Sequence, residues 1–173
     1  MNIPTLTTAR LLLRPFTLQD VDALYDILST EGILRYFPRT DPPPRERVER
    51  LLAHQLTHWE ERGCGWWAVE LQDAPGLIGW CGLQYLPEFD AVEVAYLLAQ
   101  DCWGKGLATE AARAAVRFGF AELGLERLVA IAHVDNHASQ RVILKLGMTQ
   151  VEALHLWGID CYRYELTLDK FVG

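Results

Sequence analysis

The sequence predicts an α+β fold: one domain over residues 1–173, with a mixed, mostly antiparallel sheet of about seven strands and helices on both faces. Three strand-like runs between residues 66 and 99 are separated only by turns, which indicates an antiparallel meander. Strand and helix patterns then alternate from residue 91 to residue 146, and a hairpin pattern closes the chain. This order of elements is typical of a sheet that helices cover on both sides.

The first third of the chain contains one predicted strand and two predicted helices. Residues 11–16 are expected to form the strand, and Thr17 and Asp20 offer an N-cap and an acidic first turn for a helix to about residue 29. Three consecutive prolines end at Pro44, where a new helix can begin. Residues 45–61 have an apolar inner face and a charged outer face, and Gly63 follows them as a stop signal.

The remaining two thirds of the chain supply most of the sheet. The predicted elements are strands over residues 66–71, 77–85 and 91–99, a helix over 107–123, a strand over 128–133, a helix over 136–146, and hairpin strands over 151–156 and 161–168. Residues 157–160 are expected to form the hairpin turn. In helix 107–123 a face of small residues favours close packing on a sheet, and Glu110, Arg113 and Arg117 are expected to face water.

Composition and charge exclude several classes of protein. Half of the residues are hydrophobic and 23% are charged, as in an ordinary globular domain. The net charge of −7 disfavours nucleic acid as a partner. No apolar run approaches the roughly eighteen residues of a membrane span, and no secretory signal is visible. The four cysteines are scattered and the histidines lack a third ligand, so we expect reduced thiols, a cytoplasmic location and no metal.

The most informative segment is residues 101–110, between the strand ending near residue 99 and the helix beginning at Leu107. Gly104 and Gly106 leave backbone N–H groups accessible just before a helix, where the positive end of the helix dipole also lies. Such a turn favours an anion, most simply a phosphate. The spacing fits neither the dinucleotide fingerprint, because Thr109 takes the place of its third glycine, nor a Walker loop.

The run Trp103-Gly104-Lys105-Gly106-Leu107-Ala108-Thr109-Glu110 resembles the pyrophosphate loop of the GNAT superfamily of acyl-CoA-dependent N-acetyltransferases. The resemblance is closest to the branch that acetylates the N-termini of ribosomal proteins (RimJ/RimL type). Residues 10–16, 78–83, 93–98 and 136–148 resemble the opening strand, third strand, fourth strand and last helix of that branch. The resemblance implies a GNAT fold and acetyl-CoA as co-substrate, with direct transfer to a primary amine in a ternary complex.

The resemblance also implies which residues hold acetyl-CoA. The diphosphate is expected on the loop, at Trp103, Gly104, Lys105, Gly106, Leu107, Ala108 and Thr109. The pantetheine arm is expected along the backbone of Tyr96, Leu97 and Leu98, with Asn136 as a further hydrogen-bonding partner. One position departs from the family, because Asp101 stands where Gln or Arg is usual.

Two residues are candidates for proton transfer. Glu93 lies in an apolar strand, where burial would raise the pKa of its carboxyl into the range of a general base; its strand alternation places it on the side of Ala95 and Leu97. For the leaving thiolate the resemblance implies Ser139 as the acid. Many family members have a tyrosine in the last helix, where Ile143 stands here, and in the N-terminal-acetylating branch a serine one turn earlier takes its place. The structural alternatives are a solvated glutamate for Glu93 and helix capping for Asn136 and Ser139.

The acceptor is the most open question. The resemblance favours the N-terminal α-amine of a protein, with a small amine such as a polyamine, an amino acid or an antibiotic as the alternative. A non-catalytic acyl-CoA-binding module and a nucleotide-binding regulatory domain are further alternatives. We expect a monomer or a homodimer, with no nucleic acid and no membrane as partner.

Overall fold

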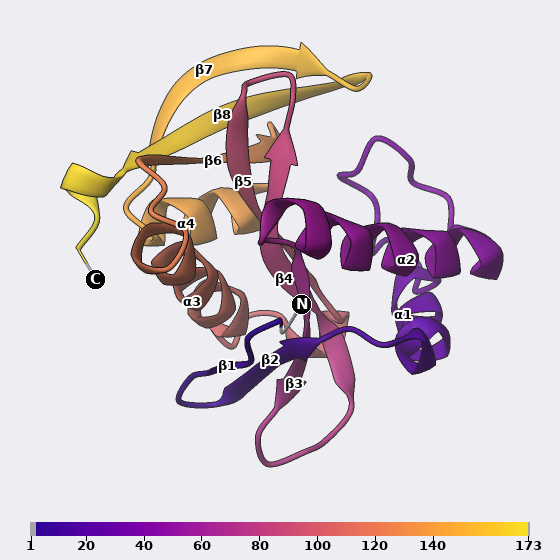
Figure 1. The fold of residues 1–173 in the computed structure, drawn as a ribbon. Coiled ribbons are helices and arrows are strands. Elements are labelled where there is room, and N and C mark those ends of the chain that lie inside the picture. The colour runs from indigo at the N-terminus through magenta and orange to yellow at the C-terminus, as the bar shows by residue number, and fades with distance from the viewer. Residues whose placement is uncertain (1–2, 173) are drawn as a thin grey trace.

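A computed structural model describes residues 3–172 as one eight-stranded sheet with helices packed on it (Figure 1). The strands are β1 (Leu6–Thr7), β2 (Leu11–Pro15), β3 (Trp66–Leu71), β4 (Leu77–Leu86), β5 (Ala91–Leu98), β6 (Arg127–His133), β7 (Thr149–Leu156) and β8 (Ile159–Thr167). The helices are α1 (Val21–Leu28), α2 (Arg45–Arg62), α3 (Leu107–Ala121) and α4 (His137–Lys145), with single 3-10 turns η1 (Leu18–Asp20), η2 (Gln100–Cys102) and η3 (Leu168–Lys170).

The sheet has the order β1-β2-β3-β4-β5-β6-β8-β7. Neighbouring strands are antiparallel except β5 and β6, which run parallel and are connected through α3. The mixed, mostly antiparallel sheet is confirmed, but the described residues contain eight strands rather than about seven. The additional strand is β1, whose two residues are too few to show an alternating pattern.

Helices cover both faces of the sheet, as predicted (Figure 1). One hydrophobic cluster joins α3 and α4 to the sheet, and a second joins α1 and α2 to the opposite face. On the α3 side, Ala111, Ala112 and Ala115 are fully buried, so the small residues do allow the helix backbone to approach β4 and β5. All four cysteines are unpaired and buried, as the sequence indicates.

Helix ends follow the expected signals. Thr17 and Asp20 form a capping box at η1, immediately before α1. Pro44 precedes the first residue of α2, and Gly63 ends that helix in the left-handed conformation, with φ of 69°. The closing hairpin differs from the expectation: its turn contains only Trp157 and Gly158, with φ of 53° and 84°, because a two-residue turn with positive φ at both positions matches the strand twist.

Candidate active site

The two parallel strands β5 and β6 separate in the middle of the sheet. They are paired only at Val92↔Leu128 and Glu93↔Val129, although each strand continues for several residues beyond that point. An opening between two strands leaves backbone groups of both without a neighbouring strand. Such groups are available to an extended ligand that carries amides.

The opening exposes particular backbone groups of β5. The N–H of Ala99 donates to the carbonyl of Ile78 at 2.8 Å, and by strand alternation the backbone groups of Leu97 also point toward β4. Those of Tyr96 and Leu98 therefore point toward the opening. The Trp103 indole N–H donates to the Leu98 carbonyl at 2.7 Å, so that carbonyl is already engaged. Tyr96 thus offers both of its backbone groups, and Leu98 offers its N–H.

The glycine-rich loop lies between η2 and α3, close to the end of β5. Gly104 and Gly106 have φ of 73° and 77°, a region that residues with a side chain rarely adopt. Gly106 is the residue before α3, and the first bond of that helix runs from the Glu110 N–H to the Gly106 carbonyl at 3.1 Å. The N–H groups of the first turn therefore have no partner within the helix, and they form a turn that suits an anion.

A salt bridge anchors this loop to the β1–β2 hairpin. Glu110 accepts hydrogen bonds from the Thr8 hydroxyl at 2.6 Å, the Arg10 backbone N–H at 2.8 Å and the Arg10 Nε at 2.7 Å. Arg10 Nη1 also donates to the carbonyl of Lys105, at 2.9 Å, inside the loop. The expectation that Glu110 faces water is wrong, because its carboxylate is only 18% exposed and these groups lower its pKa against the effect of burial.

Glu93 lies on the face of the sheet that α1 and α2 cover. It shares this face with Ala95 and Leu97, which pack in the α1–α2 cluster, as alternation predicts. Its exposed fraction is 5%, so it is a buried carboxyl rather than a solvated one. The structural alternative of an exposed edge glutamate is therefore wrong.

The Glu93 carboxyl has two hydrogen-bond donors. Gln84 Nε2 donates to its Oε2 at 2.6 Å, and the Ile131 backbone N–H donates from β6. Burial raises the pKa of Glu93 to about 7, and the nearby charge of Glu88 acts in the same direction, whereas the two donors oppose the rise. A carboxyl with a pKa near neutrality is suited to accept and release a proton at physiological pH.

Tyr96 and Ser139 meet on the opposite face, where α4 covers the sheet. The Tyr96 hydroxyl lies 3.0 Å from Ser139 Oγ and 3.2 Å from the Ser139 carbonyl. Burial raises the pKa of Tyr96, so its hydroxyl keeps its proton. The Asn136 Oδ1 accepts from the Ser139 N–H at 3.1 Å as the N-cap of α4, while Ile143 is buried in the core. Two hydroxyl groups therefore stand together at the opening.

The segment between α1 and α2 reaches across to the far end of β6. The Tyr36 ring lies 5.4 Å from the His133 ring, measured between centroids. The Arg35 guanidinium lies 4.7 Å from the centre of the Tyr36 ring and 6.0 Å from that of Trp103. These contacts place an aromatic and cationic rim between the loop and β6.

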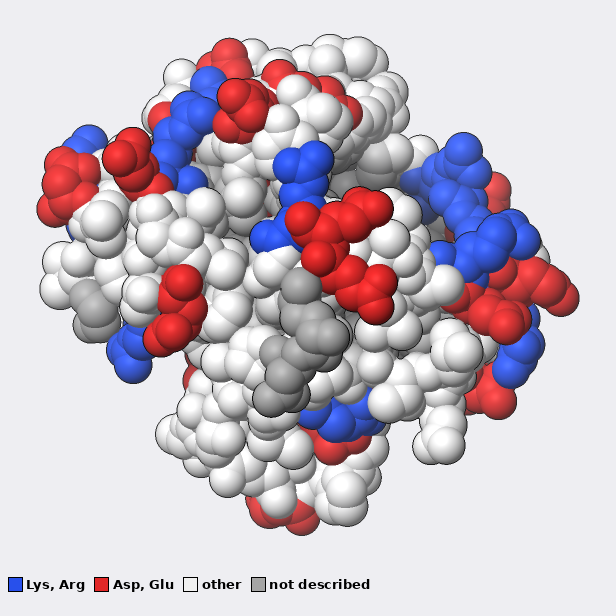
Figure 2. Space-filling view, in the orientation of Figure 1, with Lys and Arg blue, Asp and Glu red and all other residues white. Residues whose placement is uncertain are grey.

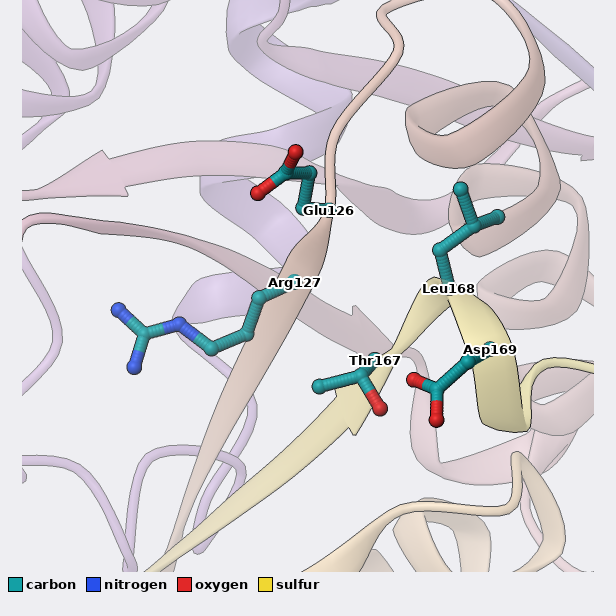
Figure 3. A pocket seen from close by; sticks show the side chains of 5 residues that line it. All are labelled: Glu126, Arg127, Thr167, Leu168 and Asp169. Atoms are coloured by element: carbon teal, nitrogen blue, oxygen red, sulfur yellow. The ribbon is translucent and has the colours of Figure 1, made fainter.

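Two hollows in the surface lie outside this arrangement of side chains. One, of about 640 Å³, lies where β6 begins and β8 ends, and Figure 3 shows that the Arg127 side chain extends away from Leu168 and Asp169. The charged groups that line this hollow do not converge on one point, and the hollow lies at the opposite end of β6 from Asn136. The other, of about 330 Å³, lies beside the loop and includes Arg10 and Lys105. Only the second adjoins the proposed anion site.

The charged residues also bear on possible partners. Acidic side chains lie beside the basic ones over most of the face drawn in Figure 2, although several basic side chains gather at the right of the view, where α2 lies in Figure 1. Within residues 3–172, no helix combines the length and the hydropathy needed to cross a membrane. Over the same residues, no group of three or more His, Cys, Asp or Glu side chains is placed to hold a metal ion.

A family model described as an acetyltransferase (GNAT) domain matches residues 10–149. The chain belongs to the GNAT acetyltransferase family. It is therefore an acyl-CoA N-acyltransferase, as the resemblance implied. An uncharacterized N-acetyltransferase, YoaA of Bacillus subtilis, is 33% identical over 146 residues, covering 83% of this chain and 82% of the relative.

Solved structures agree with this assignment. The crystal structure of an acetyltransferase from Agrobacterium tumefaciens superposes with a TM-score of 0.84 and 28% identity, over 96% of this chain and 95% of that one. RimL, a ribosomal L7/L12 α-N-protein acetyltransferase in complex with coenzyme A, has a TM-score of 0.81 and 19% identity, over 97% and 98%. At that identity the second comparison shows a shared fold alone.

The structure brings most of the predicted site residues to one opening. Glu93 lies on one face, Tyr96 and Ser139 on the other, and the loop from Gly104 to Thr109 lies near the end of β5. Trp103 is 46% exposed and Lys105 and Asp101 are exposed, so their side chains border the loop rather than form its interior. Sequence reasoning missed the side chains of Arg10, Gln84 and Tyr96 as parts of the site.

Proposed function

We propose that this acetyltransferase transfers the acetyl group of acetyl-CoA directly to the N-terminal α-amine of a protein, with Glu93 as general base and Ser139 as general acid. The observation that carries the proposal is the placement of a buried carboxyl and a pair of hydroxyls on opposite faces of the same opening. An amine that enters from the α1–α2 side and a thioester that enters from the α3–α4 side would meet between them.

The residues of the opening fit acetyl-CoA. The N–H groups of Leu107, Ala108 and Thr109 suit its diphosphate, at a helix N-terminus where Gly104 and Gly106 present no side chain. The free backbone groups of Tyr96 and Leu98 suit the two amides of the pantetheine arm. Bound acetyl-CoA supplies the acetyl group as an activated thioester.

Glu93 and Ser139 then divide the proton transfers between them. Glu93 accepts a proton from the amine as the amine attacks the thioester carbonyl. The Ser139 hydroxyl donates a proton to the departing sulfur and regains one from solvent once the thiol has left. The Tyr96 hydroxyl, 3.0 Å away, keeps its own proton and holds the Ser139 hydroxyl in position. Each transfer contributes a rate factor of about 10²–10⁴.

The pKa of Glu93 favours an α-amine over a lysine side chain. An α-amine has a pKa of roughly 7.7–8.0, whereas lysine has a pKa of about 10.4, so its neutral fraction near pH 7 is about 300-fold smaller. A base with a pKa of about 7 is close in pKa to an α-amine, but it is a far weaker base than a lysine side chain. The name of the RimL neighbour is consistent with a protein N-terminus as acceptor.

The test is a panel of acceptors in the presence of acetyl-CoA, with release of free thiol as the readout. The panel contains peptides beginning with Ala or Ser, the same peptides with blocked N-termini and one internal lysine, and polyamines. Thiol release with the free N-termini alone supports the proposal. Release with polyamines alone assigns a small-molecule acceptor, and tight binding of acetyl-CoA without release on any amine assigns a binding module.

A further inference from the structure

Three side chains on neighbouring strands form a chain of hydrogen bonds that ends on Glu93. The Trp66 indole Nε1 on β3 donates to Gln84 Oε1 on β4 at 3.0 Å. The Gln84 Nε2 then donates to Glu93 Oε2 on β5 at 2.6 Å. Gln84 and Glu93 are directly opposite in the β4–β5 register, so the second bond joins cross-strand neighbours.

The direction of these bonds is fixed by chemistry. An indole N–H is a donor only, so the Gln84 carboxamide must present its oxygen to Trp66. The carboxamide NH₂ group must then face Glu93, since the reverse orientation would oppose two donors. Gln84 therefore donates to the Glu93 carboxyl in its bound orientation, and a donor favours the ionised form of that carboxyl.

Trp66 itself is held in place. Its ring stacks on that of Trp80 with centroids 3.7 Å apart and an angle of 7° between the planes. Both side chains are buried, at 8% and 5% exposed. The Trp66 backbone N–H also donates to Gln55 Oε1 at 3.2 Å. The donor that orients Gln84 is thus part of the rigid core under α1 and α2.

We propose that Trp66 and Gln84 are positioning residues that orient the Glu93 carboxyl and keep it ionisable at neutral pH. The inference rests on the proposed role of Glu93 as general base. Without Gln84, only the Ile131 N–H would oppose the rise in the Glu93 pKa that burial causes, and the carboxyl would hold its proton more tightly. The neighbouring titratable groups are Glu88, Tyr96 and Cys161, and the variants below change none of them.

The two stacked tryptophans provide a matched pair of variants. Trp66→Phe and Trp80→Phe each remove one indole from the same buried stack, but in the part of the chain that the structure describes only the Trp66 indole bonds to Gln84. Gln84→Met keeps the length of the side chain and removes both of its hydrogen-bonding groups. We expect Gln84→Met to raise the pKa of Glu93 by about one unit, since a hydrogen bond to a charged group is commonly worth a tenfold change or more.

The readout is the pKa of Glu93 itself, followed by ¹³C NMR of labelled carboxyl groups and assigned with Glu93→Gln. A rise in Gln84→Met and a smaller rise in Trp66→Phe, with Trp80→Phe unchanged, support the proposal. An unchanged pKa in Gln84→Met overturns it, and so do equal shifts in the two tryptophan variants. Should Trp66→Phe fail to fold, Gln84→Met still decides.

A second readout separates this inference from the proposed function. The pH profile of kcat/KM should shift by the same amount as the NMR pKa in each variant. If the NMR pKa shifts and the profile does not, Glu93 is not the catalytic base, but the positioning of its carboxyl by Gln84 stands. If neither shifts, the hydrogen-bond chain has no such role.

Discussion

The hydroxyl groups of Tyr96 and Ser139 lie 3.0 Å apart, and they join the middle of the sheet to the first turn of α4. The contact spans 43 positions of sequence and crosses the mouth of the opening between β5 and β6. It places a buried phenol behind the serine that we propose as the proton donor. The two residues are therefore expected to act as one unit.

Ser139→Ala should lower kcat by about 10²–10⁴ while leaving the affinity for acetyl-CoA nearly unchanged, because the hydroxyl acts on the departing sulfur. The cap of α4 survives this change, since Asn136 bonds the backbone of Ser139 rather than its side chain. Tyr96→Phe should cost less, and the double variant should be no slower than Ser139→Ala alone. Steady-state kinetics with isothermal titration of acetyl-CoA measure both quantities. Unchanged turnover in Ser139→Ala would remove this residue from the mechanism.

Activity should depend on the ionisation of Glu93. Because a general base must be deprotonated, kcat/KM should rise with pH to a plateau with a midpoint near the Glu93 pKa of about 7. Glu93→Gln should lose the titration near pH 7, leaving only that of the acceptor amine at roughly 7.7–8.0, together with about 10²–10⁴ in rate. A wild-type profile that is flat between pH 6 and pH 8 would contradict the assignment.

The free energy of unfolding should also depend on the ionisation of Glu93. It should fall as the pH rises, whereas activity should increase. The pKa of Glu93 is raised from 4.5 to about 7, so the folded state holds the proton more strongly than the unfolded state. The stabilisation of the folded state by this tighter proton binding is complete below pH 4.5 and is lost as the pH rises through 7. From pH 5 to pH 8, wild type should therefore lose on the order of 2–3 kcal/mol relative to Glu93→Gln. Urea unfolding at both pH values measures this, and a constant difference would argue against a raised pKa.

The sequence predicts the parts of this molecule that local patterns determine. The period of residues 45–61 defines α2 to within one residue, and strand alternation places Glu93 on its correct face. The glycines of the loop are also recognisable, because positive φ leaves a local signal. The salt bridge from Arg10 to Glu110 spans 100 positions and leaves no such signal. The bonds of Gln84 likewise depend on strand register, which a single sequence does not reveal.

The Arg10–Glu110 salt bridge should contribute to acetyl-CoA affinity although neither residue is assigned to contact the ligand. Arg10→Ala should raise the Kd about 3–10-fold, because the Lys105 carbonyl loses the donor that holds the loop. Glu110→Gln should weaken the same anchor. A double-mutant cycle should show that the two effects do not add.

The control for this prediction is an ion pair of similar geometry elsewhere. Arg45 Nε lies 2.7 Å from Asp22 Oδ1, where it joins α2 to α1 on the surface. Arg45→Ala should leave the Kd unchanged, since an exposed pair far from the loop has little effect. Equal losses of affinity in Arg10→Ala and Arg45→Ala would show that the anchor has no specific role.

The loop glycines offer the most direct test of where the diphosphate lies. Gly104→Ala and Gly106→Ala place a Cβ on a backbone with φ of 73° and 77°, at a cost to folding of roughly 1–2 kcal/mol each. Gly124, which has φ of 64° and lies beyond α3, is the matched control, because an added Cβ meets nothing within 4 Å at either Gly104 or Gly124. Gly124→Ala should carry a similar cost in stability.

Only the loop variants should weaken acetyl-CoA binding, by tenfold or more, since their Cβ would occupy the approach of the phosphate. Titration calorimetry at a temperature where all three variants are folded measures the Kd. Equal affinities in the three variants would mean that the diphosphate is held elsewhere.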